Sequence, residues 1–263
     1  MPKSSAKIHP AALIEPGVKL GRNVTVGPFS VIESGASVGE GCQISSHCLV
    51  TSHARLGAKV KIFKGAVVGT DPQDLKFGGE ASELFIGART TIREFCTVNR
   101  GTAHGHMKTV IGADCLLMAY SHVAHDCAIG DHVIIANGVN MAGHVTIEEW
   151  ASISALVAIH QFVRIGRHSY IGGMSRISQD VPPYVLVNGI PPEYFGPNSV
   201  GLRRRGFTSR QVSWIKKAYH YIYQADLNLT QAVEAVQSEL EQTEEIENIL
   251  QFISQSERGL TGL

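Results

Sequence analysis

Several features that define common protein classes are missing from this 263-residue sequence. Basic and acidic residues number 23 each, so no net charge of either sign attracts nucleic acid or a charged membrane surface. No apolar run approaches the roughly 20 residues of a membrane span. The amino-terminal residues lead into no apolar segment that could be a signal peptide. We therefore expect a cytoplasmic protein that has no membrane span and does not bind nucleic acid.

Cysteine is also scarce. The five cysteines are an odd number, and their spacing suits neither paired zinc motifs nor a disulfide framework. They stand at the small positions of the repeat described next, and we interpret them as packing residues without a redox or metal role. The set is Cys42, Cys48, Cys96, Cys115 and Cys127.

What the sequence does contain is a six-residue repeat of aliphatic residues. The repeat begins at Ile8, holds its phase to Val98, shifts by one residue and continues from Ile111 to Ile177. A small or β-branched residue stands four places after each aliphatic, and a glycine often follows the aliphatic directly, as at Gly21. A helix does not have this period, whereas short strands joined by tight corners do. We expect glycine to relieve the backbone where it turns.

Three such strands close into one triangular coil, so each residue should stack on its equivalent three hexads later, at the parallel-strand spacing of about 4.8 Å. Two stretches interrupt the repeat. Residues 71–83 are rich in turn residues, and residues 102–109 cause the one-residue shift. We expect both to leave the coil as loops, and loops that project from a regular solenoid commonly form binding sites.

The carboxyl-terminal part has a different period. The repeat ends at residues 180–184, and a linker with several prolines follows. From Thr208 the apolar spacing is helical, and Gln211 three places later predicts a capping box. Further helices are predicted around residues 229–240 and 246–253. The sequence thus predicts a β-helix over residues 1–190 and a helical domain over residues 191–263.

The stretch 121–127 places two histidines and a carboxylate together. Because Val123 points into the coil, His122 should face outward, and His125 and Asp126 should lie at the next corner. Counting forward one whole coil at a time predicts a cluster of polar side chains around one glycine. The predicted neighbours are His125 on Gly143, Gly143 on Gln161 and Asp126 on His144, with His160 beside Gln161.

Two chemistries fit this cluster. A neutral histidine held by a carboxylate is a general base, and a backbone N–H facing it can stabilise an oxyanion. Alternatively, histidines on adjacent coils or subunits can hold zinc, as in the γ-class carbonic anhydrases. The residues alone leave both open.

Seven short motifs lie outside the bare repeat: Asp71–Lys76, Asn99–Thr102, His122–Cys127, Ala142–His144, His160–Gln161, Gln179–Tyr184 and Arg204–Phe207. Together they resemble the UDP-N-acetylglucosamine O-acyltransferases among the hexapeptide-repeat acyltransferases, over nearly the whole chain. The resemblance implies a mainly β fold, a left-handed parallel β-helix of hexapeptide repeats with a C-terminal α-helical domain. General crossover rules predict a right-handed winding, so the handedness follows only from the resemblance.

The resemblance implies transfer of a 3-hydroxyacyl group from acyl carrier protein to the 3-hydroxyl of UDP-N-acetylglucosamine, the first step of lipid A biosynthesis. It implies that His125 is the general base, that Asp126 orients it and that the Gly143 N–H stabilises the oxyanion. It also implies a homotrimer that uses neither a cofactor nor a metal, because the thioester already activates the acyl group.

The resemblance also implies roles for residues outside this centre. Gly173 floors the acyl pocket and sets the chain length, and basic residues of the tail receive the carrier protein. The implied substrate-binding residues are Gln73, Asp74, Lys76, Asn99, His122, His144, His160 and Gln161, with Asn198, Arg204 and Arg205 serving the nucleotide.

Some alternatives stay open. Asn99, Pro191 and Val200 depart from residues that some relatives carry, which leaves open the 3-amino analogue of UDP-N-acetylglucosamine as acceptor. The related N-acyltransferase is a poorer match, because it normally carries an extra amino-terminal domain. A non-enzymatic scaffold explains the repeat but neither the loops nor the polar columns.

Overall fold

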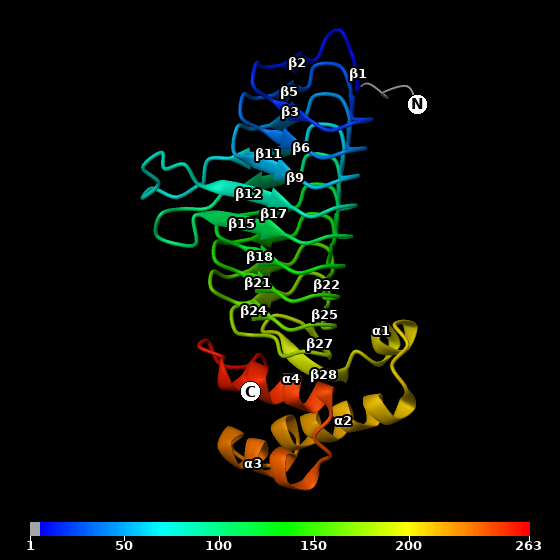
Figure 1. Ribbon diagram of the computed structural model, residues 1–263. Helices are drawn as coiled ribbons and strands as arrows, with labels where there is room; N and C mark the ends of the chain where they lie inside the picture. Colours follow the sequence, from blue (N-terminus) through cyan, green and yellow to red (C-terminus); the bar gives the residue numbers. More distant parts are fainter. Residues whose placement is uncertain (1–5) are drawn as a thin grey trace.

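The chain winds into a three-sided coil that ends in a group of helices (Figure 1). The computed structural model describes residues 6–263, so residues 1–5 of the predicted first domain and amino-terminal segment lie outside the described part. Three sheets of 11, 9 and 8 strands form the sides, which we call faces A, B and C. All strand pairs are parallel except the last pair of face A.

Face A consists of β1 (Lys7–Ile8), β4 (Thr25–Val26), β7 (Gln43–Ile44), β10 (Lys61–Ile62), β13 (Thr91–Ile92), β16 (Leu116–Leu117), β19 (Ile134–Ile135), β22 (Ser152–Ile153), β25 (Tyr170–Ile171), β27 (Val185–Asn188) and β28 (Glu193–Pro197). Face B consists of β2 (Leu13–Ile14), β5 (Val31–Ile32), β8 (Leu49–Val50), β11 (Val67–Thr70), β14 (Thr97–Asn99), β17 (His122–Val123), β20 (Asn140–Met141), β23 (Ala158–Ile159) and β26 (Arg176–Ile177). Face C consists of β3 (Lys19–Leu20), β6 (Ser37–Val38), β9 (Ala54–Leu56), β12 (Glu83–Ile86), β15 (Lys108–Ile111), β18 (Ala128–Ile129), β21 (Thr146–Ile147) and β24 (Arg164–Ile165).

The predicted register is confirmed. Ile111 pairs with Ile129, and Ile129 pairs with Ile147, so each aliphatic lies beside its equivalent one coil later. The repeating aliphatics point inward and are buried from Val26 onward, so they form one continuous core along the coil. Each such residue contributes about 1.5–3 kcal/mol by its burial. The fold is a left-handed parallel β-helix of hexapeptide repeats followed by helices, as the resemblance implied.

The role expected for the glycines that follow the aliphatics is wrong. Apart from Gly69, which has a φ of 89°, these residues do not adopt positive φ; instead, a Cβ on Gly39 would lie 2.5 Å from the backbone of Gly57 in the next coil. They are glycine because successive coils touch there. The positive φ at the corners is taken largely by other residues, such as Phe29 and His132.

The five cysteines fill small sites near the corners. All are buried free thiols, and the thiol of Cys42 donates a hydrogen bond to the carbonyl oxygen of Gly57 at 3.1 Å. Burial raises the pKa of Cys127 to about 12, so this thiol stays protonated and unreactive.

Both predicted loops leave the coil on the same side (Figure 1). The first connects β11 to β12 and spans residues 71–82, and the second connects β14 to β15 and spans residues 100–107. Ile86 pairs with Leu56, which precedes the first loop, and with Ile111, which follows the second. The first loop therefore lengthens its coil by whole hexads, which keeps the phase. The second lengthens its coil by a hexad and one further residue, which produces the shift.

The helical part contains α1 (Ser199–Arg204), α2 (Ser209–Tyr223), α3 (Leu229–Glu239) and α4 (Glu244–Ser254). The predicted capping box of Thr208 and Gln211 is present at the start of α2. The sequence prediction missed α1, which is too short to show a helical period, and the antiparallel pair of β27 with β28.

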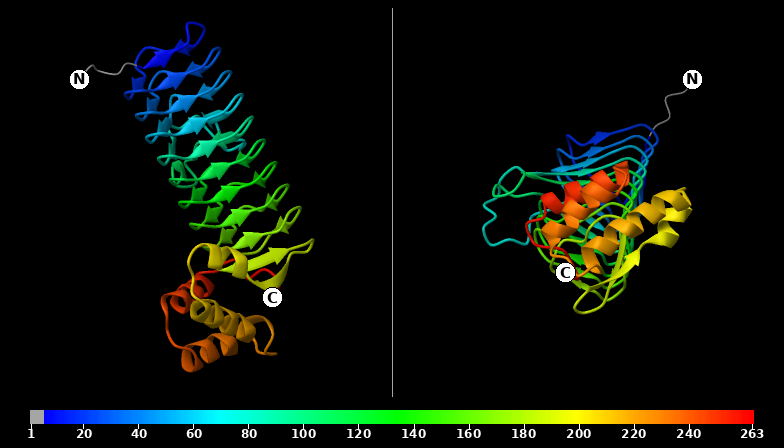
Figure 2. Two further views of the ribbon diagram at one scale, coloured as in Figure 1. Left: turned by 90° about the vertical axis from the view of Figure 1, so that its right-hand side faces the viewer. Right: turned by 90° about the horizontal axis from the view of Figure 1, so that it is seen from below.

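The helices close the end of the coil, as the view from below shows (Figure 2). Tyr219 of α2 is fully buried and donates its hydroxyl hydrogen to the carbonyl oxygen of Pro183. Asn248 of α4 donates to the hydroxyl of Tyr184 at 3.0 Å. The division of the chain at residues 190/191 stays a prediction.

Over residues 6–263, no helix has the length and apolar character needed to cross a bilayer. The cytoplasmic location stays a prediction.

Candidate active site

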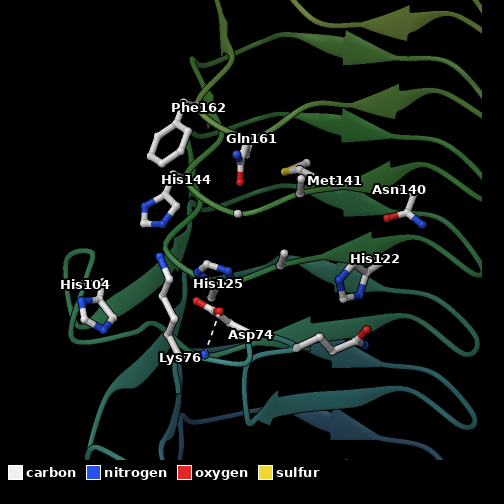
Figure 3. A pocket seen from close by; sticks show the side chains of 14 residues that line it. Asp74, Lys76, His104, His122, His125, Asn140, Met141, His144, Gln161 and Phe162 are labelled. Carbon is white, nitrogen blue, oxygen red and sulfur yellow. Dashed lines mark hydrogen bonds between the residues drawn. The ribbon is translucent and has the colours of Figure 1, made fainter. Parts of the chain in front are cut away.

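A cavity of about 600 Å³ lies where face B passes into face C, beside the first loop (Figure 3). It brings together most of the predicted site residues. Those that line it are Gln73, Asp74, Lys76, His122, His125, Gly143, His144 and Gln161.

The centre of the cavity is a histidine paired with a buried carboxylate. His125 Nδ1 lies 2.9 Å from Asp126 Oδ2, and the two side chains are 14% and 0% exposed. Asp126 has a φ of 58°, so the backbone turns there and places its side chain behind the His125 ring. The ring then faces the cavity (Figure 3).

The Asp126 carboxylate is held by several donors. It accepts hydrogen bonds from the Thr102 hydroxyl at 2.6 Å, from the Thr102 N–H at 3.1 Å and from the His106 N–H at 2.9 Å. Burial opposes its ionisation, but the bonds from Thr102, His125 and His106 outweigh burial and lower the pKa of Asp126. An ionised carboxylate only accepts, so Nδ1 of His125 carries the proton. In the neutral ring the Nε2 lone pair is then free.

Gly143 lies directly against the His125 ring, as the register predicted. A Cβ on Gly143 would lie 2.5 Å from Cε1 of His125, so no larger residue fits without moving the ring. The carbonyl oxygen of Gly143 accepts from the N–H of Phe162, while its own N–H donates to no backbone acceptor in residues 6–263.

Two further histidines complete the wall of the cavity. His122 lies 2.7 Å from the Thr97 hydroxyl, and burial, with a smaller effect of His125, lowers its pKa. His144 meets the His125 ring edge-on and stacks on Phe162 at 4.5 Å. Burial also lowers the pKa of His144. Both rings are therefore neutral near pH 7 and can donate or accept hydrogen bonds.

The first loop is anchored by Arg100, a buried residue that sequence reasoning did not single out. Its guanidinium donates to Asp71 Oδ1 at 2.7 Å and to the carbonyl oxygen of Glu80 at 2.6 Å, which ties the two ends of the loop together. Asn99 lies beside it and donates to the carbonyl oxygen of Asp71 at 2.9 Å. The structure thus places Asn99 at the base of the loop rather than in the cavity wall.

The remaining predicted residues lie elsewhere. His160 is exposed outside the lining, with Nδ1 3.1 Å from the carbonyl oxygen of Gln161. Gly173 lies at the corner between faces A and B, next to Met174. The three residues predicted to serve the nucleotide line a second cavity of about 360 Å³ on face A, formed by Ile134, Ser152, Tyr170, Leu186, Asn198, Val200, Gly201, Arg204 and Arg205.

Two of the residues predicted to serve the nucleotide have partners within the protein. The side chain of Asn198 caps α1 by accepting from the Gly201 N–H, and it donates to the carbonyl oxygen of His168. Arg205 lies over the ring of Trp150 at 5.2 Å and contacts His168 Nδ1 at 3.3 Å.

Some lining residues were missed by sequence reasoning: His104, Ala124, Asn140, Met141, Ala142 and Phe162. Counting by coils could have found two of them, since Asn140 stands one coil after His122, and Phe162 stands one coil after His144. His104 lies in the second loop, which carries no repeat from which its position follows.

Ligand atoms of His125, Asp126 and His144 lie within 4.8 Å of one another, which is close enough for the zinc site considered as an alternative. Both oxygens of Asp126 already accept hydrogen bonds, and one of the two His125 nitrogens is turned toward them. The donor set therefore suits a hydrogen-bonded dyad better than a metal site.

Known proteins resemble this chain over nearly its full length. The family model described as Udp N-acetylglucosamine O-acyltransferase, Domain 2, matches residues 180–261, and the bacterial transferase hexapeptide model matches residues 17–52 and 108–143. An acyl-[acyl-carrier-protein]–UDP-N-acetylglucosamine O-acyltransferase of Halorhodospira halophila is 47% identical over 254 residues, covering 97% of this chain and 98% of the relative. A protein of the same name from Verminephrobacter eiseniae is 48% identical over 231 residues, covering 88% of each chain.

The crystal structure of a UDP-N-acetylglucosamine acyltransferase from Bacteroides fragilis superimposes with a TM-score of 0.94 at 43% identity, covering 96% of this chain and 98% of that one. These likenesses take in the coils, both loops and the helices. The chain belongs to the UDP-N-acetylglucosamine O-acyltransferase family.

Proposed function

We propose that this chain transfers a 3-hydroxyacyl group from acyl carrier protein to the 3-hydroxyl of UDP-N-acetylglucosamine, as the first step of lipid A biosynthesis. The names of the relatives state both the donor and the acceptor. In this chain the proposal is carried by one observation: His125 is held by ionised Asp126 at 2.9 Å, and its ring faces a cavity beside Gly143.

The reaction needs a base and a site for negative charge, and this corner supplies both. Nε2 of His125 takes the proton of the sugar hydroxyl as its oxygen attacks the thioester carbonyl. The N–H of Gly143 donates to the oxygen that becomes negative. The carbon–sulfur bond then breaks, His125 returns the proton to the departing thiolate, and an ester and a free thiol remain. Asp126 keeps the imidazole in the required tautomer throughout.

The polar lining suits a sugar acceptor. Lys76 extends from the first loop toward His144, opposite His125 (Figure 3). Asp74 and Gln161 lie on either side of the same opening. We assign these groups to the sugar and the acyl hydroxyl, which offer several hydroxyls to bind, and we assign His122 and His160 to the rim of the same cleft.

The two cavities support a homotrimer. The base lies at the corner of faces B and C, while Arg204 and Arg205 line the second cavity on face A of the same chain. Packing face B of one copy against face A of the next would join the two cavities into one cleft. The corner between these faces carries the exposed apolar residues such contact would cover: Phe29, Phe95, Tyr120, Leu156 and Met174.

The carrier protein is acidic by the resemblance, and basic side chains suit its docking. Arg203, Lys216 and Lys217 are exposed on α1 and α2, at the same end of the molecule as the second cavity. We assign this surface to the carrier protein.

Gly173 supports a long acyl chain. Gly173 is exposed, and a Cβ there would meet the Ala155 carbonyl oxygen closely, at 3.3 Å, and the Ser154 side chain at 3.8 Å, so the glycine leaves room at the surface that a side chain would take up. We expect a chain of the length of 3-hydroxymyristoyl to be accepted.

The test is to incubate the protein with UDP-N-acetylglucosamine and 3-hydroxyacyl carrier proteins of several lengths, and to identify the product by mass spectrometry. A product that gains one hydroxyacyl group, in the presence and absence of EDTA, is expected. Product formed only with the 3-amino sugar nucleotide would overturn the choice of acceptor. Loss of activity on chelation, restored by zinc, would replace the base mechanism by a metal mechanism.

A further inference from the structure

The second loop folds over the carboxylate of Asp126. Residues 102–107 turn tightly, because the Thr102 carbonyl oxygen accepts from the N–H groups of Gly105 and Met107 at 3.2 and 3.1 Å. This turn directs the Thr102 hydroxyl, the Thr102 N–H and the His106 N–H at the two oxygens of Asp126. The loop therefore supplies donors to both oxygens of the carboxylate, including the Oδ2 that His125 also contacts.

Gly105 shows how closely the loop fits the carboxylate. A Cβ at this residue would lie 2.2 Å from Cγ of Asp126 and 2.4 Å from its Oδ1. Gly105 does not adopt a positive φ, so its backbone conformation does not require glycine. Glycine is required here because any side chain would overlap the Asp126 carboxylate.

The Thr102 hydroxyl differs from other buried threonine hydroxyls in what it binds. Thr90 donates to the carbonyl oxygen of Gly112 and accepts from the N–H of Cys115, so it joins one coil to the next. Thr109 accepts from the N–H of Asp126. Thr102 alone of the three donates its hydroxyl hydrogen to a side chain, the same Asp126 Oδ2 that accepts from His125.

We propose that Thr102 is a positioning residue for acyl transfer, and that the loop of residues 102–107 fixes the plane of the Asp126 carboxylate so that His125 presents Nε2 to the sugar hydroxyl. The inference rests on the proposed function. A carboxylate can rotate about its terminal bond, and His125 alone supplies a single hydrogen bond to Oδ2. Donors on both oxygens remove that rotation, and the ring then follows the carboxylate.

The experiment compares four purified proteins with saturating donor and varied UDP-N-acetylglucosamine. Thr102→Val removes the hydroxyl without changing the size of the side chain, and Thr102→Ser restores it. Thr90→Val makes the same change in a coil-to-coil contact. We expect Thr102→Val to lower kcat about tenfold with KM within about twofold, which is the effect of one hydrogen bond to a charged group. Thr102→Ser should recover most of kcat, and Thr90→Val should lower Tm and leave kcat unchanged.

Gly105→Ala gives an independent test, because its methyl group displaces the carboxylate while every donor remains. It should lower kcat at least as much as Thr102→Val. Wild-type kcat in Thr102→Val, equal kcat in the valine and serine variants, or wild-type kcat in Gly105→Ala would overturn the inference. An inactive wild-type protein would instead overturn the proposed function.

Discussion

Two corners of the coil share one backbone conformation but differ in the side chains they carry, apart from Phe162 between faces B and C, which is exposed and apolar. Between faces B and C the residues with φ near +60° include Asp126 and His144, which build the proposed active centre. Between faces A and B the equivalent residues include Leu156 and Met174, which are exposed and apolar. The coil therefore fixes where a corner side chain points and leaves its chemistry free.

In the last coils, the third corner, between faces C and A, is a column of aromatic rings. His132, Trp150, His168 and Tyr184 stack in succession, with centroids 4.0, 6.1 and 5.7 Å apart. Arg205 packs on this column, which links it to the second cavity. One residue per coil thus stacks at this corner, as His144 and Phe162 do between faces B and C, and we propose that one corner holds the reactive group and another a binding group.

Substitutions at two glycines in neighbouring corners give the strongest test of this comparison. Gly143→Ala places a methyl group 2.5 Å from the His125 ring, and we expect kcat to fall about 100-fold, because the base and the oxyanion donor move apart. Gly138→Ala, at the corner of faces A and B, meets only the flexible Leu156 side chain at 2.9 Å. It should cost about 1 kcal/mol of stability with little change in kcat. Equal kcat for the two variants would refute the division of roles between the corners.

Leu156→Glu tests the apolar corner. A charge placed in the proposed subunit contact should dissociate the trimer, and activity should fall at least tenfold because the two cavities no longer meet. Phe85→Glu is the matched control, since Phe85 is exposed on face C. Sedimentation of both variants measures the assembly. A monomeric, fully active Leu156→Glu protein would contradict the shared cleft.

Gly173→Met tests the acyl pocket at the same corner. The methionine side chain should extend along the exposed surface beside Ala155 and shift the preferred acyl chain to shorter lengths. Competing carrier proteins of several chain lengths, read by mass spectrometry, measure the shift. An unchanged chain profile would remove Gly173 from the acyl path.

Substitution in the aromatic corner should have the smallest effect of the four, and it should appear in how stability depends on pH. Burial, followed by Arg205 and Arg167, lowers the pKa of His168 to about 4, against roughly 6.5 in the unfolded chain. Between these values the unfolded state binds a proton that the folded state does not, so stability falls as pH drops from about 6.5 to about 4. His168→Phe keeps the stack and should lose this part of the pH dependence. If Tm varied with pH in the same way in the wild type and in His168→Phe, His168 would not be the source of this pH dependence.

The repeat allowed much of the fold to be predicted, because a strict period determines register. Ile111 predicts its partner Ile129 by counting alone, and the same counting placed His125 on Gly143. The corners were less predictable. Glycine was expected at the turn, whereas Trp150 and Leu156 adopt positive φ. For Trp150, stacking on His132 of the preceding coil offsets the strain.

The loops were predictable as interruptions but not as structures. Nothing periodic relates Thr102 or His106 to Asp126, since the turn that aims their donors depends on hydrogen bonds within the loop. The same holds for Arg100, whose partners Asp71 and Glu80 lie in a different, irregular segment of the chain.

The most direct test of the account is the single-turnover rate of acyl transfer in His125→Ala, measured at saturating UDP-N-acetylglucosamine and 3-hydroxyacyl carrier protein. Loss of a general base predicts a rate lower by about 10²- to 10⁴-fold. Tm should stay close to that of the wild type, because the His125 ring faces the cavity rather than the core. A rate within a few-fold of the wild type, in a correctly folded variant, would show that the corner of faces B and C is not the catalytic centre.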